Sequence, residues 1–448
     1  MSASIGIGGT LNAVLKQFYG FGLIEEINNE VMALELFEKA KVDWNGRECF
    51  IPVHTTRNTG TGWRAATSLP TAGQQGYTNM LVTAQRLYGR FSVEGDAIEA
   101  LGKGGENAFV NGLEGEMKGL KEDLRNAANQ SLISGRRVIG FMSQQNSVSA
   151  GADDWMFDGD FDKLAALRVA AGADQIEFRL IRMSDKLIHP NPIAAGSGIE
   201  SVNASLGTIN LNAILDTTAG AGGWNTALVA GDIYAVEITG PAATVATLDL
   251  EPAGIYTNLG AVSPFGVSAA TFPVMRAIGF SSVADGGAAA PAAPGVDRTA
   301  IDLDLHLQGC IDRIYTACGI EKAPNLWLAA VSQRSRYVGL SSLTTAIRSD
   351  FTNRTKVGGL DQGYDVNKLG YGGLPIKVSR HVGNGHWIAL YTESWKLAEL
   401  GEMKWAETDG NVLSRVANAD VWEGFMRWYV NFVCLQPHCN GVVTGLAL

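Results

Sequence analysis

Charged residues are scarce in this sequence of 448 residues, and basic ones are the scarcer kind. Charged side chains make up 18% of the chain, and 35 Lys and Arg stand against 45 Asp and Glu, for a formal net charge of −10. A protein that reads nucleic acid neutralises phosphates with a basic face, so this balance argues against that class. Hydrophobic residues make up 46%, which is enough to bury a sizeable core.

Targeting signals are missing as well. Lys16 interrupts the apolar residues near the N-terminus, and no basic stretch precedes them. The longest uncharged stretch, residues 252–275, is rich in Gly, Pro, Ser and Thr. We therefore expect neither a secretory signal nor a membrane helix, and no membrane partner.

The sequence also lacks the common catalytic and phosphate-binding motifs, since no G-x-S-x-G, H-E-x-x-H, G-x-x-x-x-G-K-[ST] or C-x-x-C occurs. The five cysteines are odd in number and widely spread, which is typical of reduced thiols in a cytosolic environment. Cys434, His438 and Cys439 could bind zinc with His381 and His386 only if the two segments meet, and the spacings match no standard zinc site. We expect no enzyme activity, no metal and no cofactor.

The N-terminal hundred residues predict two elements that cannot be stable alone. Residues 11–40 carry apolar side chains at helical spacing, interrupted by Gly20 and Gly22, and have little apolar mass. Two strand-like runs within residues 46–94 flank a long tip rich in Gly, Thr and Asn, which indicates an extended hairpin. An isolated hairpin is marginal in water, so it needs a partner surface. Trp63 and Leu69 at the tip are candidate anchors to a neighbour, although both could simply cover their own strands.

The clearest helix is predicted over residues 106–134, where Leu113, Met117, Leu120 and Leu124 form one stripe. A second stripe of glycines, Gly112, Gly115 and Gly119, indicates either the close approach of another backbone or simply a weak helix.

Further elements are predicted toward the C-terminus. We expect a helix that ends at Gly319, a buried strand at residues 325–331 and a second helix through Leu343. Residues 344–373 form a polar loop, and Gly383-Asn384-Gly385 indicates a hairpin between the strands that flank it.

Residues 187–275 contain no Lys or Arg but six acidic residues. Short strand patterns alternate there with Gly and Pro turns, and residues 284–295 read as a low-complexity linker. This acidic segment predicts an inserted, mostly β module over residues 190–298. Because its carboxylates repel other negative charges at short range, we expect the module to lie at the surface, away from any polyanion.

The order of these elements resembles that of tailed-bacteriophage major capsid proteins, which share the Hong Kong 97-type capsid fold. The match lies in LYGRFSVEGDAIEAL at residues 87–101 and in the run from YGGLPIKVSRHVGNGHW to CNGVVTGL at residues 371–446. The resemblance implies an α+β fold whose parts are an N-terminal arm (1–45), an extended loop hairpin (46–95), a peripheral domain with the spine helix (96–189), the inserted acidic module (190–298), an axial domain (299–373) and return strands (374–448).

The resemblance also implies function and partners. Family members assemble with themselves into hexamers and pentamers of an icosahedral virion shell around double-stranded DNA, and assembly takes place in the bacterial cytoplasm. The expected partners are a portal protein, a separate scaffolding protein and, through weak non-specific contact, the DNA. The sequence leaves open whether a cement protein binds. Because the hairpin begins near residue 46, we expect no fused scaffolding segment and no cleavage of the N-terminal region.

In this family the axial domains converge at the capsomer centre. The resemblance therefore makes residues of the polar loop candidates for contact between subunits, in addition to Trp63 and Leu69 of the hairpin: Arg348, Arg354, Lys356 and Asp361. Two alternatives remain, namely the shell protein of an encapsulin-type nanocompartment and a secreted β-rich adhesive or carbohydrate-binding protein.

Some family members join subunits by an isopeptide bond from a Lys of the extended loop to an Asn of a neighbour. This sequence has no Lys between Lys41 and Lys103, and the loop carries only arginines, whose guanidinium stays protonated and cannot act as the nucleophile. Reduced, boiled particles should therefore give a single band near the monomer mass on a denaturing gel. A ladder of oligomers would contradict this prediction.

Overall fold

The computed structural model describes residues 32–37, 41–43, 46, 48–64, 68–96, 106–145, 153–171, 176–188, 199–203, 208–211, 233–281, 303–343, 370–407, 412–417 and 419–446. Helices and strands are mixed along the chain, so the predicted α+β class is confirmed at that level. The described part of the predicted arm contains α2 (Met32–Phe37) and β1 (Lys41–Asp43). Phe37 of α2 packs against Phe432 with ring centroids 4.6 Å apart, so this segment lies on the core of its own chain.

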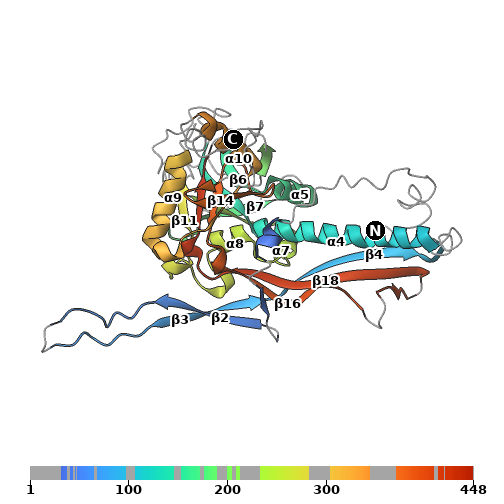
Figure 1. The fold of residues 1–448 in the computed structure, drawn as a ribbon, viewed down its shortest axis with the longest axis horizontal. Helices are drawn as coiled ribbons and strands as arrows, with labels where there is room; N and C mark the ends of the chain where they lie inside the picture. The colour runs from blue at the N-terminus through green and yellow to red at the C-terminus, as the bar shows by residue number, and fades with distance from the viewer. Residues whose placement is uncertain are drawn as a thin grey trace, which may run out of the picture.

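A long sheet and a long helix form one end of the molecule (Figure 1). The predicted helix is present as α4 (Glu106–Ser134). The sheet has the order β1–β16–β18–β17, formed by β16 (Trp395–Trp405), β17 (Ser414–Arg415) and β18 (Val421–Cys434), and β4 (Gln85–Glu94) pairs antiparallel with β18. Gly89 of β4 faces the helix so closely that a Cβ there would stand 2.7 Å from the Leu124 side chain. A Cβ on Gly115 or Gly119 would meet no described atom within 4 Å, so neither of these two glycines serves a close backbone approach within the described chain.

The extended hairpin is formed by β2 (Glu48–Thr56) and β3 (Gly76–Thr83), which project toward the opposite end (Figure 1). One face of the hairpin packs with Phe265, Val267 and Val433 and contributes Cys49, Ile51, Val53, Met80 and Val82. The second strand-like run predicted from the sequence is divided. Its first part is β3, and its second part, β4, leaves the hairpin to join β18.

Two further sheets form the centre of the fold. One has the order β7–β10–β5–β6–β9–β8 and the other β11–β19–β15–β12–β14–β13. The first contains β5 (Val138–Gln145), β6 (Asp153–Gly159), β7 (Glu177–Arg182), β8 (Ile199–Asn203), β9 (Thr208–Leu211) and β10 (Tyr234–Gly240). The second contains β11 (Ile278–Ser281), β12 (Leu326–Ala329), β13 (Gly370–Tyr371), β14 (Leu374–Val378), β15 (Trp387–Leu390) and β19 (Gly441–Thr444). The helices beside them are α5 (Phe161–Ala171), α7 (Ala242–Leu248), α8 (Ile255–Gly260), α9 (Leu303–Cys318) and α10 (Val331–Leu343), with short 3-10 turns η3 (Pro264–Gly266), η4 (Pro273–Met275), η5 (Ile320–Lys322), η7 (Thr392–Ser394) and η8 (Pro437–Cys439).

The helix–strand–helix order after residue 300 is confirmed, and Gly319 ends α9 with a φ of +82°, a conformation that favours glycine. The hairpin predicted around Gly383-Asn384-Gly385 is wrong, because β12 lies between β14 and β15 and pairs with both. The segment between these strands instead packs against the end of β6, where a Cβ on Gly383 would stand 2.1 Å from the Gly159 backbone nitrogen.

The prediction that residues 190–298 fold as a separate module is wrong for residues 233–281. Strand β10 lies between β5 and β7, β11 pairs with β19, and α8 contributes Ile255, Tyr256 and Leu259 to the main core. Three acidic residues of the segment form ion pairs with bases that precede it: Glu237 with Arg179, Asp249 with Arg137, and Glu251 with Lys163. For these three acidic residues, the preceding segment supplies the bases that residues 187–275 lack. Residues 212–232 and 282–302 lie outside the described chain.

Candidate functional site

The outward face of the β2–β3 hairpin is apolar and uncovered. Phe50, Tyr77 and Leu81 are 62%, 67% and 39% exposed. Phe50 stands opposite Leu81 in the strand register, and His54 stands opposite Tyr77 with ring centroids 5.1 Å apart. Because the strand period is two residues, these side chains share the face opposite to the one that packs on the core. The hairpin is thus half-buried by its own chain, and its other side presents exposed apolar side chains that are interrupted by Asn79 and His54.

The tip of the hairpin carries the two anchors predicted from the sequence. Trp63 is 103% exposed and Leu69 is 93% exposed, so neither covers its own strand. The two sides of the tip stay close beyond the paired strands, since a Cβ on Gly60 would stand 2.7 Å from the Gly73 nitrogen. The other four candidates, Arg348, Arg354, Lys356 and Asp361, lie outside the described residues, and their role stays a prediction.

A second surface was not predicted. On the face of the long sheet that points away from α4, arginines alternate with tyrosines across β4 and β18, with Arg86 opposite Tyr429 and Tyr88 opposite Arg427. The tyrosine rings meet edge to face at 6.1 Å, and Arg427 lies over the ring of Tyr429. The side-chain hydrogen bond between Tyr88 and Tyr429 raises the pKa of Tyr88 and lowers the pKa of Tyr429. Their alternation is visible along each strand, but only the β4–β18 register brings them together.

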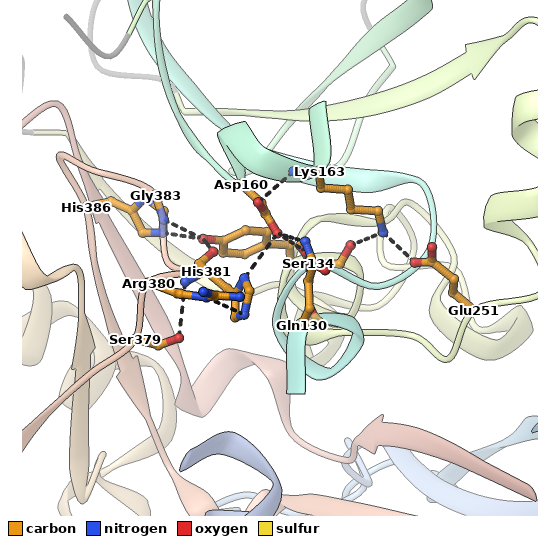
Figure 2. Close-up of polar contacts among 11 residues, drawn as sticks. Gln130, Ser134, Asp160, Lys163, Glu251, Ser379, Arg380, His381, Gly383 and His386 are labelled. Carbon is orange, nitrogen blue, oxygen red and sulfur yellow. Dashed lines mark hydrogen bonds and ion pairs between the residues drawn. The ribbon is translucent and has the colours of Figure 1, made fainter. Parts of the chain in front are cut away.

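A buried polar cluster joins segments that are far apart in the sequence (Figure 2). At its centre Asp160, which lies between β6 and α5 and is 3% exposed, accepts hydrogen bonds from the Ser134 hydroxyl at 2.6 Å and the Lys163 amide at 2.9 Å. The imidazole of His381 lies 4.0 Å from the same carboxylate. The Lys163 ammonium, in turn, contacts the Ser134 carbonyl and the Glu251 carboxylate. Buried charges are stable only when paired in this way.

Tyr256 of α8 completes the cluster from the other side. Its hydroxyl accepts a hydrogen bond from the Gly383 amide at 3.0 Å and lies 3.0 Å from Nε2 of His386 (Figure 2). Burial raises the pKa of Tyr256 well above its usual value, so the hydroxyl stays protonated. The tyrosine thus fixes the β14–β15 segment onto α8.

The cluster has the character of a structural joint. His381, His386 and Tyr256 are buried, which leaves a substrate no access to them. Cys434 and Cys439 have other neighbours, Ser394 and Gln436, so the structure does not bring them together with the two histidines as a zinc site would require. Among the described residues, no group of His, Cys, Asp or Glu could hold a metal ion. No helix in that part of the chain has the length and apolar character needed to cross a membrane.

Solved structures that are similar to this chain come from phage capsids and related particles. The cyanophage A-1(L) capsid matches with 10% identity and a TM-score of 0.49 over 98% of each chain. The capsid of the native GTA particle matches with 9% identity and a TM-score of 0.43 over 99% of this chain and 100% of that one. A chain of Mycobacterium phage Bobi matches with 10% identity and a TM-score of 0.41 over 99% of each. No protein-family model and no curated protein matches this chain.

Removing the Tyr256 hydroxyl should loosen the joint. Tyr256→Phe leaves the buried Gly383 amide and the His386 imidazole without this partner, which we expect to cost about 1–3 kcal/mol of unfolding free energy. Tyr391→Phe is the matched control, because that hydroxyl bonds only to Glu393 at the surface, and its effect should stay within about 0.5 kcal/mol. Thermal unfolding of both variants measures the difference. Equal midpoints would show that the Tyr256 contacts do not hold the joint.

Proposed function

We propose that this chain is the major capsid protein of a tailed phage. It has the Hong Kong 97-type fold and assembles into hexamers and pentamers of an icosahedral shell that encloses double-stranded DNA. The observation that carries the proposal is the β2–β3 hairpin, whose outward apolar face and tip are not covered by their own chain.

A second copy of the chain is the cover that best fits this surface. A hairpin that exposes Phe50, Tyr77, Trp63 and Leu69 is unfavourable in water and prone to associate. Its position also suits repeated assembly, because the hairpin and the sheet of β4 and β18 project toward opposite ends of the molecule (Figure 1). Each subunit can then place its hairpin on a neighbour while it receives another.

Burial of these side chains supplies the stability that covalent linkage would otherwise provide. At about 25 cal/mol per Å² of apolar area, a contact repeated around every capsomer adds a large total per shell. Trp63 and Leu69 act as the anchors at the tip. Residues 299–373 form the axial domain at the capsomer centre, where Arg348, Arg354 and Lys356 pair with acids such as Asp361 of neighbours, each pair being individually weak.

The remaining partners follow from the same proposal. The shell assembles in the host cytoplasm on a separate scaffolding protein, meets a portal protein at one vertex and becomes the virion capsid. Contact with DNA is weak and non-specific, because the net charge of −10 per chain opposes tight binding of phosphates. No cofactor takes part.

Variants of the outward hairpin face test the proposal. Phe50→Ser and Trp63→Ser together should reduce assembled particles at least about tenfold. The thermal midpoint of the unassembled chain should change little, because Trp63 is fully exposed and Phe50 is mostly exposed in that chain. Val169→Ser is the control, since Val169 is 87% exposed on α5, away from the hairpin, and should assemble normally.

Electron microscopy and sedimentation of the purified proteins supply the readout. Closed shells of the parent chain and their loss in the hairpin variant support the proposal. Cargo-filled shells would favour the nanocompartment alternative, and a parent chain that remains monomeric under all assembly conditions would favour an adhesive or carbohydrate-binding protein. Normal assembly of the hairpin variant would contradict the proposal that this face joins subunits.

A further inference from the structure

The turn that follows β7 buries a lysine. Lys186 is 1% exposed and is among the largest fully buried side chains of the described chain. Its backbone φ is +60°, a left-handed conformation that residues other than glycine rarely adopt. Because lysines are almost never fully buried unless they are paired, this position calls for a physical explanation.

The turn itself holds Lys186 in place. Arg182 and Asp185 form an ion pair across the turn, and the Asp185 carboxylate accepts a hydrogen bond from the Leu187 amide at 3.0 Å. The Lys186 amide donates to the Arg182 carbonyl at 2.9 Å. The backbone on both sides of Lys186 is thus fixed, and its side chain stays in the core.

The side-chain nitrogen of Lys186 has only neutral partners. It contacts the Leu259 carbonyl near the C-terminal end of α8 and lies 3.0 Å from Sδ of Met183. Within the described chain Lys186 forms no ion pair. A buried ammonium without a carboxylate is costly, whereas a neutral amine can keep the same two contacts without that cost.

A nearby cation also opposes a charge on Lys186. Arg276, which lies just before β11, donates to the Ser184 carbonyl of the same turn at 3.3 Å and to the Ala269 carbonyl at 2.7 Å. A guanidinium stays charged in proteins, so it repels a second positive charge beside it. Burial first, and the charge of Arg276 second, lower the pKa of Lys186 from 10.5 to about 7.

The other charged or titratable side chains around the turn do not contact the Lys186 nitrogen. Arginines engage Asp185 and Glu237, and burial keeps the Tyr256 hydroxyl protonated. On the turn, β7, β10 and α8 the full set of such side chains is Glu177, Arg179, Arg182, Asp185, Tyr234, Glu237 and Tyr256.

We propose that Lys186 makes the contact between β7 and α8 sensitive to pH. Above neutral pH its amine is uncharged and holds the turn on the Leu259 carbonyl. As the pH falls, the amine takes up a proton from the solvent, the ammonium leaves its buried place for water, and the turn separates from α8. The inference concerns the isolated chain and does not depend on the proposed function.

The direction of the effect follows from the protons that the two states bind. The pKa of this lysine is 10.5 in the unfolded chain and about 7 in the folded chain. Between these pH values the unfolded chain holds one proton more, so stability rises with pH and is lost as the pH falls toward 7. Burial lowers the pKa of His438, which titrates below this window, and raises the pKa of Cys434 to about 12, which affects stability mainly above pH 9.

The test measures urea unfolding of the purified, unassembled full chain at pH 7.0 and 8.5, beside Lys186→Met. The variant side chain has a similar length and cannot take a proton, and the variant keeps every other titrating group. The unfolding constant of the parent, divided by that of the variant, should therefore fall about tenfold between the two pH values. At pH 7.0 the variant should be the more stable chain.

Lys404→Met is the matched control, because Lys404 is exposed on β16, and it should keep the pH dependence of the parent. A parent-to-variant ratio that stays constant with pH would overturn the proposal. If Lys186→Met does not fold, the parent alone decides the question, because its own stability must rise from pH 7.0 to 8.5.

Hydrogen exchange shows whether the effect is local to the turn. After correction for intrinsic rates, the parent peptide 182–188 should be less protected at pH 6.0 than at pH 8.0, whereas the β5 peptide 138–145 should change little. In Lys186→Met the turn should be equally protected at both pH values. Equal protection of the parent turn at both pH values would also overturn the proposal.

Discussion

A two-stranded ribbon in water must cover its apolar side chains, and β2–β3 covers only half of them. Its inner face is buried against η3 and β18, while Phe50, Tyr77 and Leu81 remain outside. The chain cannot solve this by folding back, because β3 ends at Thr83 and the next strand, β4, leaves to pair with β18. The exposed face is thus a consequence of the topology, and a neighbouring subunit is the cover that we infer.

The rest of the fold holds this ribbon at a fixed angle to the long sheet. The Asn431 side chain of β18 donates to the Thr83 carbonyl at the hairpin base and accepts from the Ala253 amide. Deeper in the molecule, the cluster around Asp160 and Tyr256 fixes the sheet that contains β12 to the one that contains β6. Buried polar groups of this kind add little net stability but permit only one arrangement, since any other leaves a charge unpaired.

Local signals in the sequence located α4, α9 and α10, missed α5, α7 and α8, and failed for the long-range pairing of strands. The leucine stripe located α4 and the glycine at 319 located the end of α9, because helices depend on near neighbours. The turn signal at Gly383-Asn384-Gly385 predicted a hairpin that does not form, because a third strand at residues 326–329 lies between the two flanking strands. The prediction of a separate acidic module failed for a related reason, because it ignored partners that are distant in the sequence. Asp249 and Glu251 pair with Arg137 and Lys163, about a hundred residues upstream. At the candidate site, the sequence alone indicated Trp63 and Leu69 as anchors, and both are exposed in the structure. The surface of alternating arginines and tyrosines could not be predicted, because it depends on the register between β4 and β18.

A cryo-electron microscopy map of particles assembled from the purified chain tests the central claim most directly. The account predicts closed shells in which the outward face of β2–β3, with Phe50 and Tyr77, is buried against a neighbouring copy and Trp63 at the tip inserts into that copy. A shell in which this face remains open to solvent, with subunits joined entirely through other surfaces, would contradict it.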